Sequence, residues 1–472
     1  MPTEHAQTGL AGHMADIPLP LPDDPLATFA ALRERLPAAV WLDGAAGGRY
    51  SIMTAAPRGQ LVSRAGRTRY YASASRASAP GDGGVDLGRA DPLALLGERL
   101  GDGPVGMAPF AGGAIGYFGY ELGRRLQGQA PADAGMPEMA VGLYDWALVI
   151  DHPAGRAWLA GEPPAGLVGW LRAAPRSMPG RWQALSEVSA TPAAEGYARA
   201  FARVQHYLRA GDCYQVNLAR HFSAAFDGDP LAVYADFRGR AGGPFAAYLD
   251  LPGGPVLSGS PERFLRLDKG WVETQPIKGT RARAADPQAD AAVREALRAS
   301  AKDRAENLMI VDLLRNDLGR SCETGSVSVP RLFALASYAT VHHMVSTVTG
   351  RLAAGRQATD LLRDCLPGGS ITGAPKLRAM EIIDELEAGP RGIYCGAIGY
   401  IGHDGAMDTS IAIRTMTARD GRLEYRAGGG VVVDSQAAAE FDETESKAVA
   451  FRRLVATAPR SLLQSSNAAA LV

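Results

Sequence analysis

The sequence predicts an α+β fold built on large antiparallel β-sheets. Short strand-like runs alternate with Gly and Pro turns through the first third of the chain, where helical stretches are few. The rest mixes hairpin-like strands with helices, which favours an α+β fold over a doubly wound parallel one. A length of 472 residues suits one large domain or two moderate ones.

Shifts in composition divide the chain into two regions between two tails. Residues 1–25 are Pro-rich and polar and are predicted to form a tail, as are residues 457–472 at the other end. Periodicity fades between 173 and 192, a stretch with three prolines, so a boundary is expected near residue 190. This leaves an N-terminal region at 26–190 and a larger region at 191–456.

Strands and helices can be placed in order along the chain. In residues 195–213 apolar side chains recur at helical spacing from Tyr197 to Leu208, and Gly211 is the expected C-terminal stop. The other elements are predicted from alternation and turn signals. Strands are expected at 49–57, 112–122, 144–152, 214–222, 261–268, 271–277, 394–402, 409–417 and 428–434, and helices at 302–319, 376–387 and from about 435.

The composition points to a small molecule or another protein as the partner. Lys and Arg number 49 against 50 Asp and Glu, with no basic block, so no nucleic-acid footprint is indicated. No apolar run approaches the ~20 residues of a membrane span, and the N-terminus lacks signal-peptide character, so a cytosolic location is expected. The four scattered cysteines are expected to be buried thiols, and none lies in the motif of a thiol hydrolase.

Two pairs of acidic residues lie three positions apart on predicted helices. Asp303 and Glu306 share one helix face, and so do Glu440 and Glu443. Like charges at this spacing repel unless a cation lies between them, and Mg²⁺ is one candidate because it prefers carboxylate oxygens. Solvated surface charge is the alternative. The apolar run after Glu306 indicates an interior helix, and the acids of the last helix lie beside its packing stripe, which keeps the metal site open.

A series of motifs in the larger region resembles the chorismate-utilising enzymes. They lie between about 193 and 456 and read GDCYQVNLAR, SGSPERFL, PIKGTRAR, DRAENLMIVDLLRNDLGR, HHMVSTV, PGGSITGAPKLRAMEIIDELE, GAIGY and DSQAAAEFDETESKA. Within this family they are most similar to the aminodeoxychorismate synthase component I branch. The N-terminal region matches more loosely, through RYSIMTAAP and GGAIGYFGYELGR. The resemblance implies an αββα architecture like that of anthranilate synthase component I, with sheets between outer helices.

The resemblance implies chorismate as the substrate and Mg²⁺ as the cofactor. The matching metal site consists of Glu306 and Glu443 as ligands and of Asp303 and Glu440, which would contact metal-bound water. The matching contacts to substrate are Gly279, Thr280, His343, Ser370, Tyr394, Arg414, Gly428, Gly429, Gly430 and Lys447.

Several of these positions have a plainer explanation. Arg414, in the predicted strand 409–417, matches a group that holds a carboxylate, but such an arginine can also bury its stem and leave its head in water. The glycines at 428–430 let backbone amides approach an anion, or form a flexible turn. His342, beside the matching His343, is expected to be structural.

Two positions separate the reactions within the family. Gln215 stands where water-adding relatives carry a lysine base, and because glutamine cannot deprotonate water, isochorismate and salicylate synthesis are disfavoured. Lys278 stands where anthranilate synthases typically have alanine. From its strand-and-turn context alone, Lys278 is either a surface charge or a buried nucleophile. The resemblance implies the nucleophile, placed beside C2 of the substrate.

The implied reaction is amination of chorismate at C4 through a covalent Lys278 intermediate. Neutral Lys278 attacks C2 as the C4 hydroxyl leaves, and ammonia then attacks C4 and expels the lysine. Glu262 matches the general acid, which requires a raised pKa, although an exposed ion pair with Arg263 is the alternative. The product would be 4-amino-4-deoxychorismate, on the way to p-aminobenzoate and folate. An anthranilate synthase component I and a non-catalytic chorismate-binding scaffold are the rival readings.

The implied reaction needs an outside source of ammonia, because the chain carries no cysteine hydrolase motif. The implied partner is a separate glutamine amidotransferase subunit that releases ammonia and passes it across the interface. Free ammonia would substitute at high concentration.

Some relatives bind tryptophan through the N-terminal region. The matching positions here are Arg49, Tyr50, Ser51, Ile52, Pro244, Phe245 and Ala246. The sequence departs from the pattern at Asp43 and Gly44, where relatives usually supply a serine contact, and this departure argues against tryptophan binding.

Overall fold

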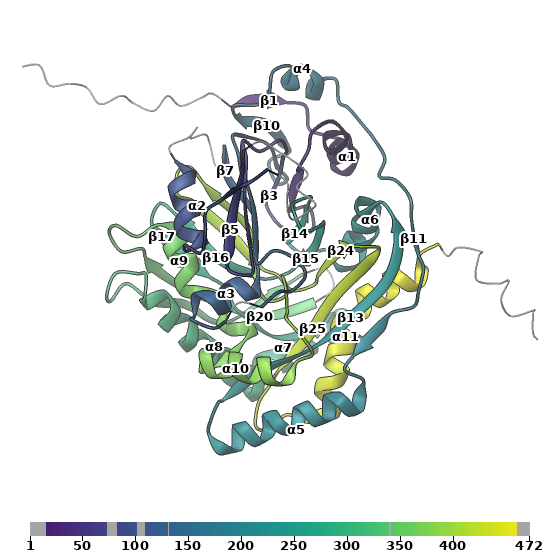
Figure 1. The fold of residues 1–472 in the computed structure, drawn as a ribbon. Helices are drawn as coiled ribbons and strands as arrows, with labels where there is room; N and C mark the ends of the chain where they lie inside the picture. The colour runs from purple at the N-terminus through teal and green to yellow at the C-terminus, as the bar shows by residue number, and fades with distance from the viewer. Residues whose placement is uncertain (1–15, 73–82, 102–108, 131, 339–340, 460–472) are drawn as a thin grey trace, which may run out of the picture.

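Two large antiparallel sheets dominate the structure, a computed structural model that describes residues 16–72, 83–101, 109–130, 132–338 and 341–459 (Figure 1). Within this part of the chain, the first sheet runs in the order β1 (Ile17–Leu19), β10 (Arg156–Gly161), β9 (Trp146–Asp151), β3 (Tyr50–Thr54), β2 (Val40–Asp43), β14 (Phe245–Leu249), β15 (Val256–Ser260), β24 (Thr415–Arg419), β25 (Arg422–Val431), β13 (Gln215–Gly228) and β11 (Trp182–Ala184). Two short strands, β12 (Ser189–Thr191) and β21 (Gly373–Ala374), also pair with β13.

The second sheet is ordered β18 (Ile277–Ala282), β20 (Val341–Arg351), β17 (Trp271–Thr274), β16 (Arg263–Asp268), β23 (Met407–Ile411), β22 (Ala397–Gly402), β7 (Gly113–Phe118), β8 (Met139–Tyr144), β4 (Gly59–Arg64), β5 (Arg67–Ala72) and β6 (Val85–Asp86). In addition β19 (Ser328–Ser337) pairs with β20. The helices are α1 (Pro25–Arg35), α2 (Pro92–Leu100), α3 (Tyr120–Leu126), α4 (Leu167–Arg172), α5 (Ala194–Ala210), α6 (Pro230–Ala241), α7 (Pro287–Ala299), α8 (Ala301–Gly319), α9 (Ala358–Cys365), α10 (Lys376–Leu386) and α11 (Ala437–Thr457), with a short 3₁₀ helix at Gly369–Ile371.

Three hydrophobic clusters show how the sheets and helices are layered. One cluster joins inner side chains of both sheets, such as Val149 of β9 and Ile115 of β7. A second packs α1, α6 and α11 on the first sheet, and the third packs α2, α8, α9 and α10 on the second. The order helix, sheet, sheet, helix confirms the predicted α+β class and its αββα architecture.

Both sheets take strands from both sides of residue 190. In the first sheet β2 pairs with β14, and in the second β7 pairs with β22. The predicted boundary near residue 190 therefore marks a change in the sequence, but each sheet continues across it with strands from both regions. The prediction that residues 1–25 form only a tail is wrong in its last part, because Ile17–Leu19 pair with β10 and α1 begins at Pro25. Residues 1–15 and 460–472 of the predicted tails lie outside the described residues.

The helices that lead to the site follow their sequence signals, with one exception. In α5 the side chains of Tyr197, Phe201, Val204 and Leu208 are buried, and Gly211 ends the helix at a φ of +80°. The prediction that α8 is an interior helix is wrong, because Leu308 is 52% exposed and only one face is covered. The exposed face is available to solvent while Asp303 and Asn307 point inward.

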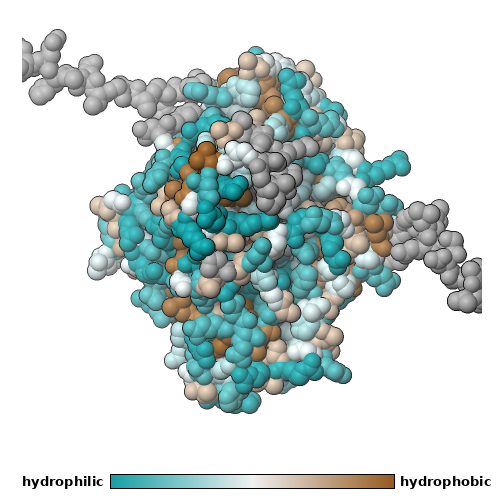
Figure 2. Space-filling view, in the orientation of Figure 1, coloured by the Kyte–Doolittle hydropathy of each residue, from teal (hydrophilic) through white to brown (hydrophobic). Residues whose placement is uncertain are grey.

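The cysteines and the surface agree with the composition. All four cysteines are free and buried, as predicted. Burial raises the pKa of Cys322 to about 11 and that of Cys395 to about 12, so neither is an activated thiolate. None of the described helices is both long and apolar enough to cross a membrane. The face in Figure 2 is mostly hydrophilic, with hydrophobic residues in small separate patches.

Candidate active site

Lys278 is placed by an irregular stretch of β18. The pairing of β18 with β20 shifts register between Ile277 and Thr280, which is the position of a bulge that redirects a side chain. Gly279 holds this bend at a φ of +85°, and a Cβ there would lie 2.9 Å from Leu297 Cδ1, so glycine is required. The Nζ of Lys278 donates a hydrogen bond to the Ser370 carbonyl at 3.2 Å. Lys278 therefore points inward, and the surface-charge alternative is wrong.

Glu262 and Lys278 meet through Ser370. The Ser370 hydroxyl donates to Glu262 Oε1 at 3.3 Å, while its carbonyl accepts from Lys278. Burial raises the pKa of Glu262 to about 7 against the opposing charge of Lys278, and burial lowers the pKa of Lys278 against the charges of Glu306 and Glu262. The pKa of Glu262 therefore lies near neutral pH, and burial favours the neutral amine of Lys278.

Arg263 takes no part in this pair. Its guanidinium binds Asp408 at 3.0 Å and Glu273 at 3.4 Å, whereas the neighbouring Glu262 is 6% exposed and faces Ser370. The exposed ion pair considered for Glu262 is therefore not formed.

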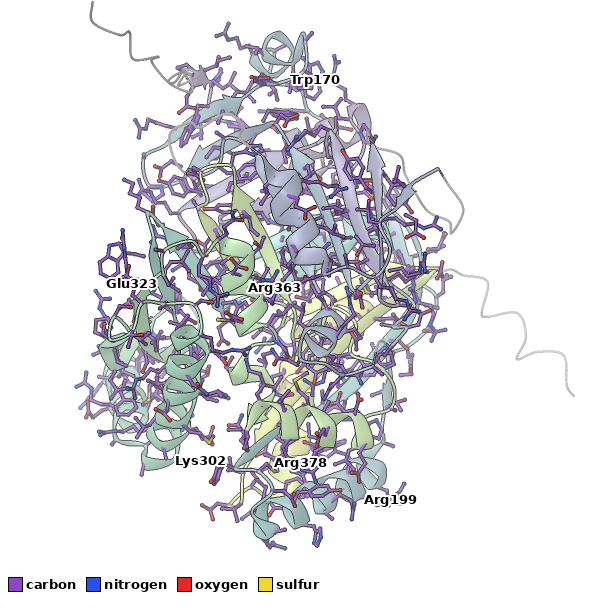
Figure 3. All side chains as sticks on the ribbon, turned by 60° about the vertical axis from the view of Figure 1, so that its left-hand side comes forward. Trp170, Arg199, Lys302, Glu323, Arg363 and Arg378 are labelled. Atoms are coloured by element: carbon purple, nitrogen blue, oxygen red, sulfur yellow. The ribbon has the colours of Figure 1, made fainter. Side chains whose placement is uncertain are left out.

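The four carboxylates come from α8 and α11, as the sequence indicated. Asp303 and Glu440 are buried, at 8% and 4% exposed, so these two are not solvated surface charges. The negative charges of Glu306 and Glu443 both raise the pKa of Lys278. The α8 and α11 helices therefore meet beside this lysine. Figure 3 shows Lys302, in the first turn of α8, at the opposite end of the molecule from Trp170 of α4.

Cations of the protein itself engage three of these carboxylates. Arg281 Nη2 lies 2.7 Å from Asp303 Oδ2, Lys447 Nζ lies 2.6 Å from Glu443 Oε1, and Lys302 Nζ lies 3.8 Å from Glu306 Oε1. In the ranges that the structure describes, no three His, Cys, Asp or Glu side chains are grouped closely enough to hold a metal ion.

Glu440 differs from the other three carboxylates. Its Oε1 accepts a hydrogen bond from the Ser435 hydroxyl at 2.7 Å, while its Oε2 is buried and has no hydrogen-bond partner among the described residues. A Cβ on Gly429 would lie 2.8 Å from Glu440 Oε2 and 3.3 Å from Glu443 Oε1. An unsatisfied carboxylate oxygen beside a second carboxylate is a donor set that fits Mg²⁺.

The glycines at 428–430 lie inside β25, so the flexible-turn alternative is wrong. They pair with Ala219, Leu218 and Asn217 of β13. On the other edge, the recorded pairing with β24 stops at Tyr425. The backbone of these glycines is thus open on one side, where it can approach a ligand closely.

Arg414 stands at the break that leaves this edge open. The predicted strand 409–417 is wrong as a single element, because β23 ends at Ile411 and β24 begins at Thr415. Arg414 lies between them at a φ of +51°, an uncommon conformation for a residue with a side chain. Its charge helps to lower the pKa of His343, which burial lowers most, to about 4.

The remaining matched residues surround the same place. Thr280 Oγ1 and His343 Nδ1 lie 2.8 Å apart, Lys447 Nζ donates to the Gly428 carbonyl at 2.7 Å, and Tyr394 is buried with its ring beside Arg391. His342, in contrast, is held by Ser337 and Asp290, which agrees with the structural role expected for it.

Gln215 is buried under the glycine-rich segment of β25. A Cβ on Gly430 would lie 2.9 Å from Gln215 Cδ. Both polar atoms of its amide are buried without a hydrogen-bond partner among the described residues. A buried, unsatisfied amide at this point offers a donor and an acceptor to a bound molecule.

The residues matched to a tryptophan pocket lie on adjacent strands far from Lys278 in the chain. β2 pairs with β3 on one side and with β14 on the other, which brings Ser51 and Ala246 to the two sides of Asp43. Asp43 forms an ion pair with Arg238 at 2.7 Å, and the Ser51 hydroxyl lies 2.8 Å from His152 Nε2. The Asp43 carboxylate is therefore engaged by Arg238 and Ser51 inside the protein.

Arg391 is a structural centre of the site that the sequence motifs did not reveal. Its guanidinium donates to Glu387, to the Ile371 carbonyl at 3.1 Å and to the Asn217 carbonyl at 2.8 Å, and it stacks near Tyr394. It thereby joins α10, β13 and the segment that carries Ser370. Its place directly before Gly392, Ile393 and Tyr394 gave no signal of burial.

Glu387→Gln is expected to lower the free energy of unfolding by about 3–5 kcal/mol, because it leaves Arg391 charged and unpaired inside the protein. The two side chains are 1% and 2% exposed and 2.6 Å apart. Denaturant unfolding measures the change. Glu385→Gln is the matched control, since its ion pair with Arg203 is exposed and worth about 0–1 kcal/mol. Equal losses in the two variants would contradict this account.

Comparisons with known proteins agree with this geometry. Residues 61–453 match the family model described as chorismate binding enzyme. The chain is 47% identical to aminodeoxychorismate synthase component 1 of Klebsiella aerogenes, over 84% of this chain and 88% of that protein. It is 40% identical to anthranilate synthase component 1 of Streptomyces coelicolor, over 76% of each. The crystal structure of anthranilate synthase component I from Streptococcus pneumoniae TIGR4 superposes with a TM-score of 0.73 at 30% identity, covering 86% of this chain and 93% of that one. The chain therefore belongs to the family of chorismate binding enzymes.

Proposed function

We propose that this protein is the chorismate-aminating component of aminodeoxychorismate synthase, which converts chorismate and ammonia to 4-amino-4-deoxychorismate. The observation that carries the proposal is the pair formed by the half-buried, inward-pointing Lys278 and the buried Glu262, joined through Ser370. Relatives with that name are more similar in sequence than the anthranilate synthase named above. The buried Gln215 also supports amination, because its amide cannot serve as the base for water.

Chorismate would be held between the open edge of β25 and the two acidic helices. Arg414 would bind one carboxylate with its guanidinium, together with the backbone amides of Gly428–Gly430. Thr280 and His343 would contact the substrate near its ring, and Tyr394 would contact the same carboxylate as Arg414. Because burial and Arg414 keep His343 neutral, it would contribute a hydrogen bond without adding charge.

Lys278 would act as the nucleophile. Its neutral Nζ attacks C2 of chorismate, the two conjugated ring double bonds shift, and the C4 hydroxyl leaves as water after taking a proton from Glu262. Ammonia then attacks C4, the two double bonds shift back and the bond between C2 and Nζ breaks. The carboxylate of Glu262 takes the surplus proton of the new amine. The residues return to their starting states, and chorismate plus ammonia gives the aminated product plus water.

Mg²⁺ would be held by Glu306 and Glu443, with Asp303 and Glu440 contacting its waters. When bound, it would supply Lewis-acid polarisation of the allylic system and a fixed position for a substrate carboxylate. Lys447 and Lys302 would then give up their contacts to the two ligand carboxylates. The unsatisfied Glu440 Oε2 would gain a hydrogen-bond donor.

Removal of divalent ions with EDTA is expected to abolish amination, and added Mg²⁺ to restore it. Glu443→Gln is expected to raise the Mg²⁺ concentration needed for half-maximal rate by roughly tenfold or more, since a ligand charge is lost. Asp442→Asn, at the exposed neighbouring position, is the control. An unchanged Mg²⁺ requirement in Glu443→Gln would rule out its ligand role.

The product formed from chorismate, Mg²⁺ and ammonium tests the whole proposal. Chromatography against authentic standards should detect 4-amino-4-deoxychorismate. Direct formation of blue-fluorescent anthranilate would identify the protein as an anthranilate synthase component instead. Binding of chorismate without its consumption would identify a scaffold.

The source of ammonia in this proposal is a separate glutamine amidotransferase subunit. The name component 1 carried by relatives implies a second component, and the four buried thiols of this chain are poor candidates for a glutaminase nucleophile. Glutamine should therefore support the reaction only when the amidotransferase is added, whereas ammonium should support it with this protein alone.

A further inference from the structure

A buried ion pair joins α8 to α10 beside the proposed active site. Lys376, the first residue of α10, places its Nζ 2.8 Å from Asp317 Oδ2 of α8, and both side chains are buried. The same Nζ donates a hydrogen bond to the Cys365 carbonyl at 3.1 Å. Cys365 is the last residue of α9. One ammonium group therefore holds the end of α9, the start of α10 and the inward face of α8 together.

The segment between these two anchor points carries Ser370. Residues 366–375 connect α9 to α10, and the 3₁₀ helix Gly369–Ile371 within this segment contacts α8. A Cβ on Gly369 would lie 2.3 Å from Leu313 Cδ2 and 3.7 Å from Asp317 Oδ2. The backbone of the segment thus lies directly against α8 and beside the ion pair, one residue before Ser370.

Asp317 lies on the same face of α8 as the acidic residues of the proposed metal site. The buried residues of this helix recur at helical spacing from Asp303 through Ile310 and Leu314 to Asp317. A continuous helix keeps a fixed rise of about 1.5 Å per residue along this face. The ion pair therefore sets the position of the Ser370 segment relative to Asp303 and Glu306, which the same helix carries.

Stability alone does not account for two charges at this place. Apolar side chains of similar volume often stabilise a protein interior as well as a buried ion pair does. An apolar side chain at position 376 would remove the hydrogen-bond donor from the Cys365 carbonyl, whereas the ammonium reaches this carbonyl and the Asp317 carboxylate at once. What the pair adds is a fixed direction for the chain that enters and leaves the Ser370 segment.

We propose that Lys376 and Asp317 are positioning residues for the amination of chorismate, an inference that rests on the proposed function. They hold Ser370 where its carbonyl accepts from Lys278 Nζ at 3.2 Å and its hydroxyl donates to Glu262 Oε1 at 3.3 Å. Both act through Ser370 rather than on the substrate. The result is a fixed separation between the nucleophile and the general acid.

The pair should be replaced as a unit, because removal of one partner leaves the other charge buried and unpaired. The double variant Lys376→Met with Asp317→Val is expected to lower kcat by roughly tenfold to a hundredfold, the cost of a small misplacement of catalytic groups. Denaturant unfolding should show a stability close to that of the wild type. Both proteins are assayed with saturating chorismate, ammonium and Mg²⁺.

A matched control removes a different ion pair from the same helix. Arg203→Met with Glu385→Val deletes an exposed pair between α5 and α10 that has no contact with the Ser370 segment. This double variant should keep the wild-type kcat.

The pH profile separates positioning from a purely structural role. Hydrogen bonds from Ser370 and the Ile277 amide, and the charges of Lys278 and Lys447, lower the pKa of Glu262 against the effect of burial. When Ser370 is no longer held, its hydrogen bond to the carboxylate weakens and this pKa should rise. The alkaline fall of the rate should therefore move above pH about 7. A mere loss of folded protein would lower the rate by the same factor at every pH.

Asp317→Asn is a second variant in case the double variant does not fold. It keeps the size of the side chain and an acceptor for Lys376 but removes the negative charge, so it should move the profile in the same direction by a smaller amount. A wild-type kcat with a wild-type pH profile in the folded variants would overturn the inference. If the wild-type protein makes no 4-amino-4-deoxychorismate, the proposed function fails instead, and that result is known before any variant is compared.

Discussion

Lys278→Ala should reduce formation of 4-amino-4-deoxychorismate by at least about 10³-fold, the order of loss seen when a covalent nucleophile is removed. The Nζ that would attack C2 is lost, and the space it leaves beside C2 becomes open to ammonia. The small residual turnover should therefore shift toward the 2-amino product. Product chromatography measures both changes, and mass spectrometry of the wild-type protein with chorismate should find an adduct on Lys278.

Two further variants separate nucleophilicity from charge. Lys278→Arg keeps a cation next to Glu262 and Glu306 but removes the nucleophile, so it should be as inactive as Lys278→Ala. Lys269→Ala, in the exposed turn between β16 and β17, removes a lysine from the surface and should leave the rate unchanged. Undiminished product formation by Lys278→Ala would exclude the covalent role.

Glu262→Gln should lower kcat by about 10²–10⁴-fold, the usual contribution of a general acid or base. The glutamine amide keeps the size and the hydrogen bond from Ser370 but cannot give a proton to the departing C4 hydroxyl. In the wild-type protein the acid must be protonated and Lys278 must be neutral. The rate should therefore rise with pH as Lys278 loses its proton, and fall as pH increases through about 7, the raised pKa of Glu262.

The pH profile distinguishes this role from a structural one. Glu262→Gln should lose the alkaline fall near pH 7 along with most of its rate. Glu273→Gln, which alters a surface partner of Arg263, should keep the wild-type profile. A Glu262→Gln profile that falls near pH 7 like the wild type would assign that titration to another group.

The sequence predicted the elements that have strong local signals. The helical spacing of Tyr197 to Leu208 with Gly211 at its end located α5, and the paired acids located inward-facing carboxylates on α8 and α11. Both patterns depend on side chains a few positions apart, which a helix brings together by its own geometry. The identity of Lys278 as an inward group, in contrast, depended on the resemblance of PIKGTRAR to a family motif.

The parts that were not predicted depend on contacts distant in sequence. A pattern of apolar residues continues on both sides of Arg414 and suggested a single strand. The strand is interrupted at Arg414, because β23 before it and β24 after it belong to different sheets. The burial of Arg391 depends on Glu387 nearby and on carbonyls of Ile371 and Asn217, which no local spacing relates. Likewise α8 could not be assigned an exposed face, since its apolar residues surround the helix and its contacts with β18, β20 and α9 decide which side is covered.

The shared sheets have a consequence for any attempt to shorten the protein. A fragment that begins at residue 191 would retain Lys278, Glu262 and the four carboxylates, yet it would strip β2 from β14 and β7 from β22. Each sheet would then present an unprotected strand edge with its backbone donors and acceptors exposed, which is a template for aggregation. The first 190 residues thus protect, by strand pairing, the edges of the strands β14 and β22 in the larger region.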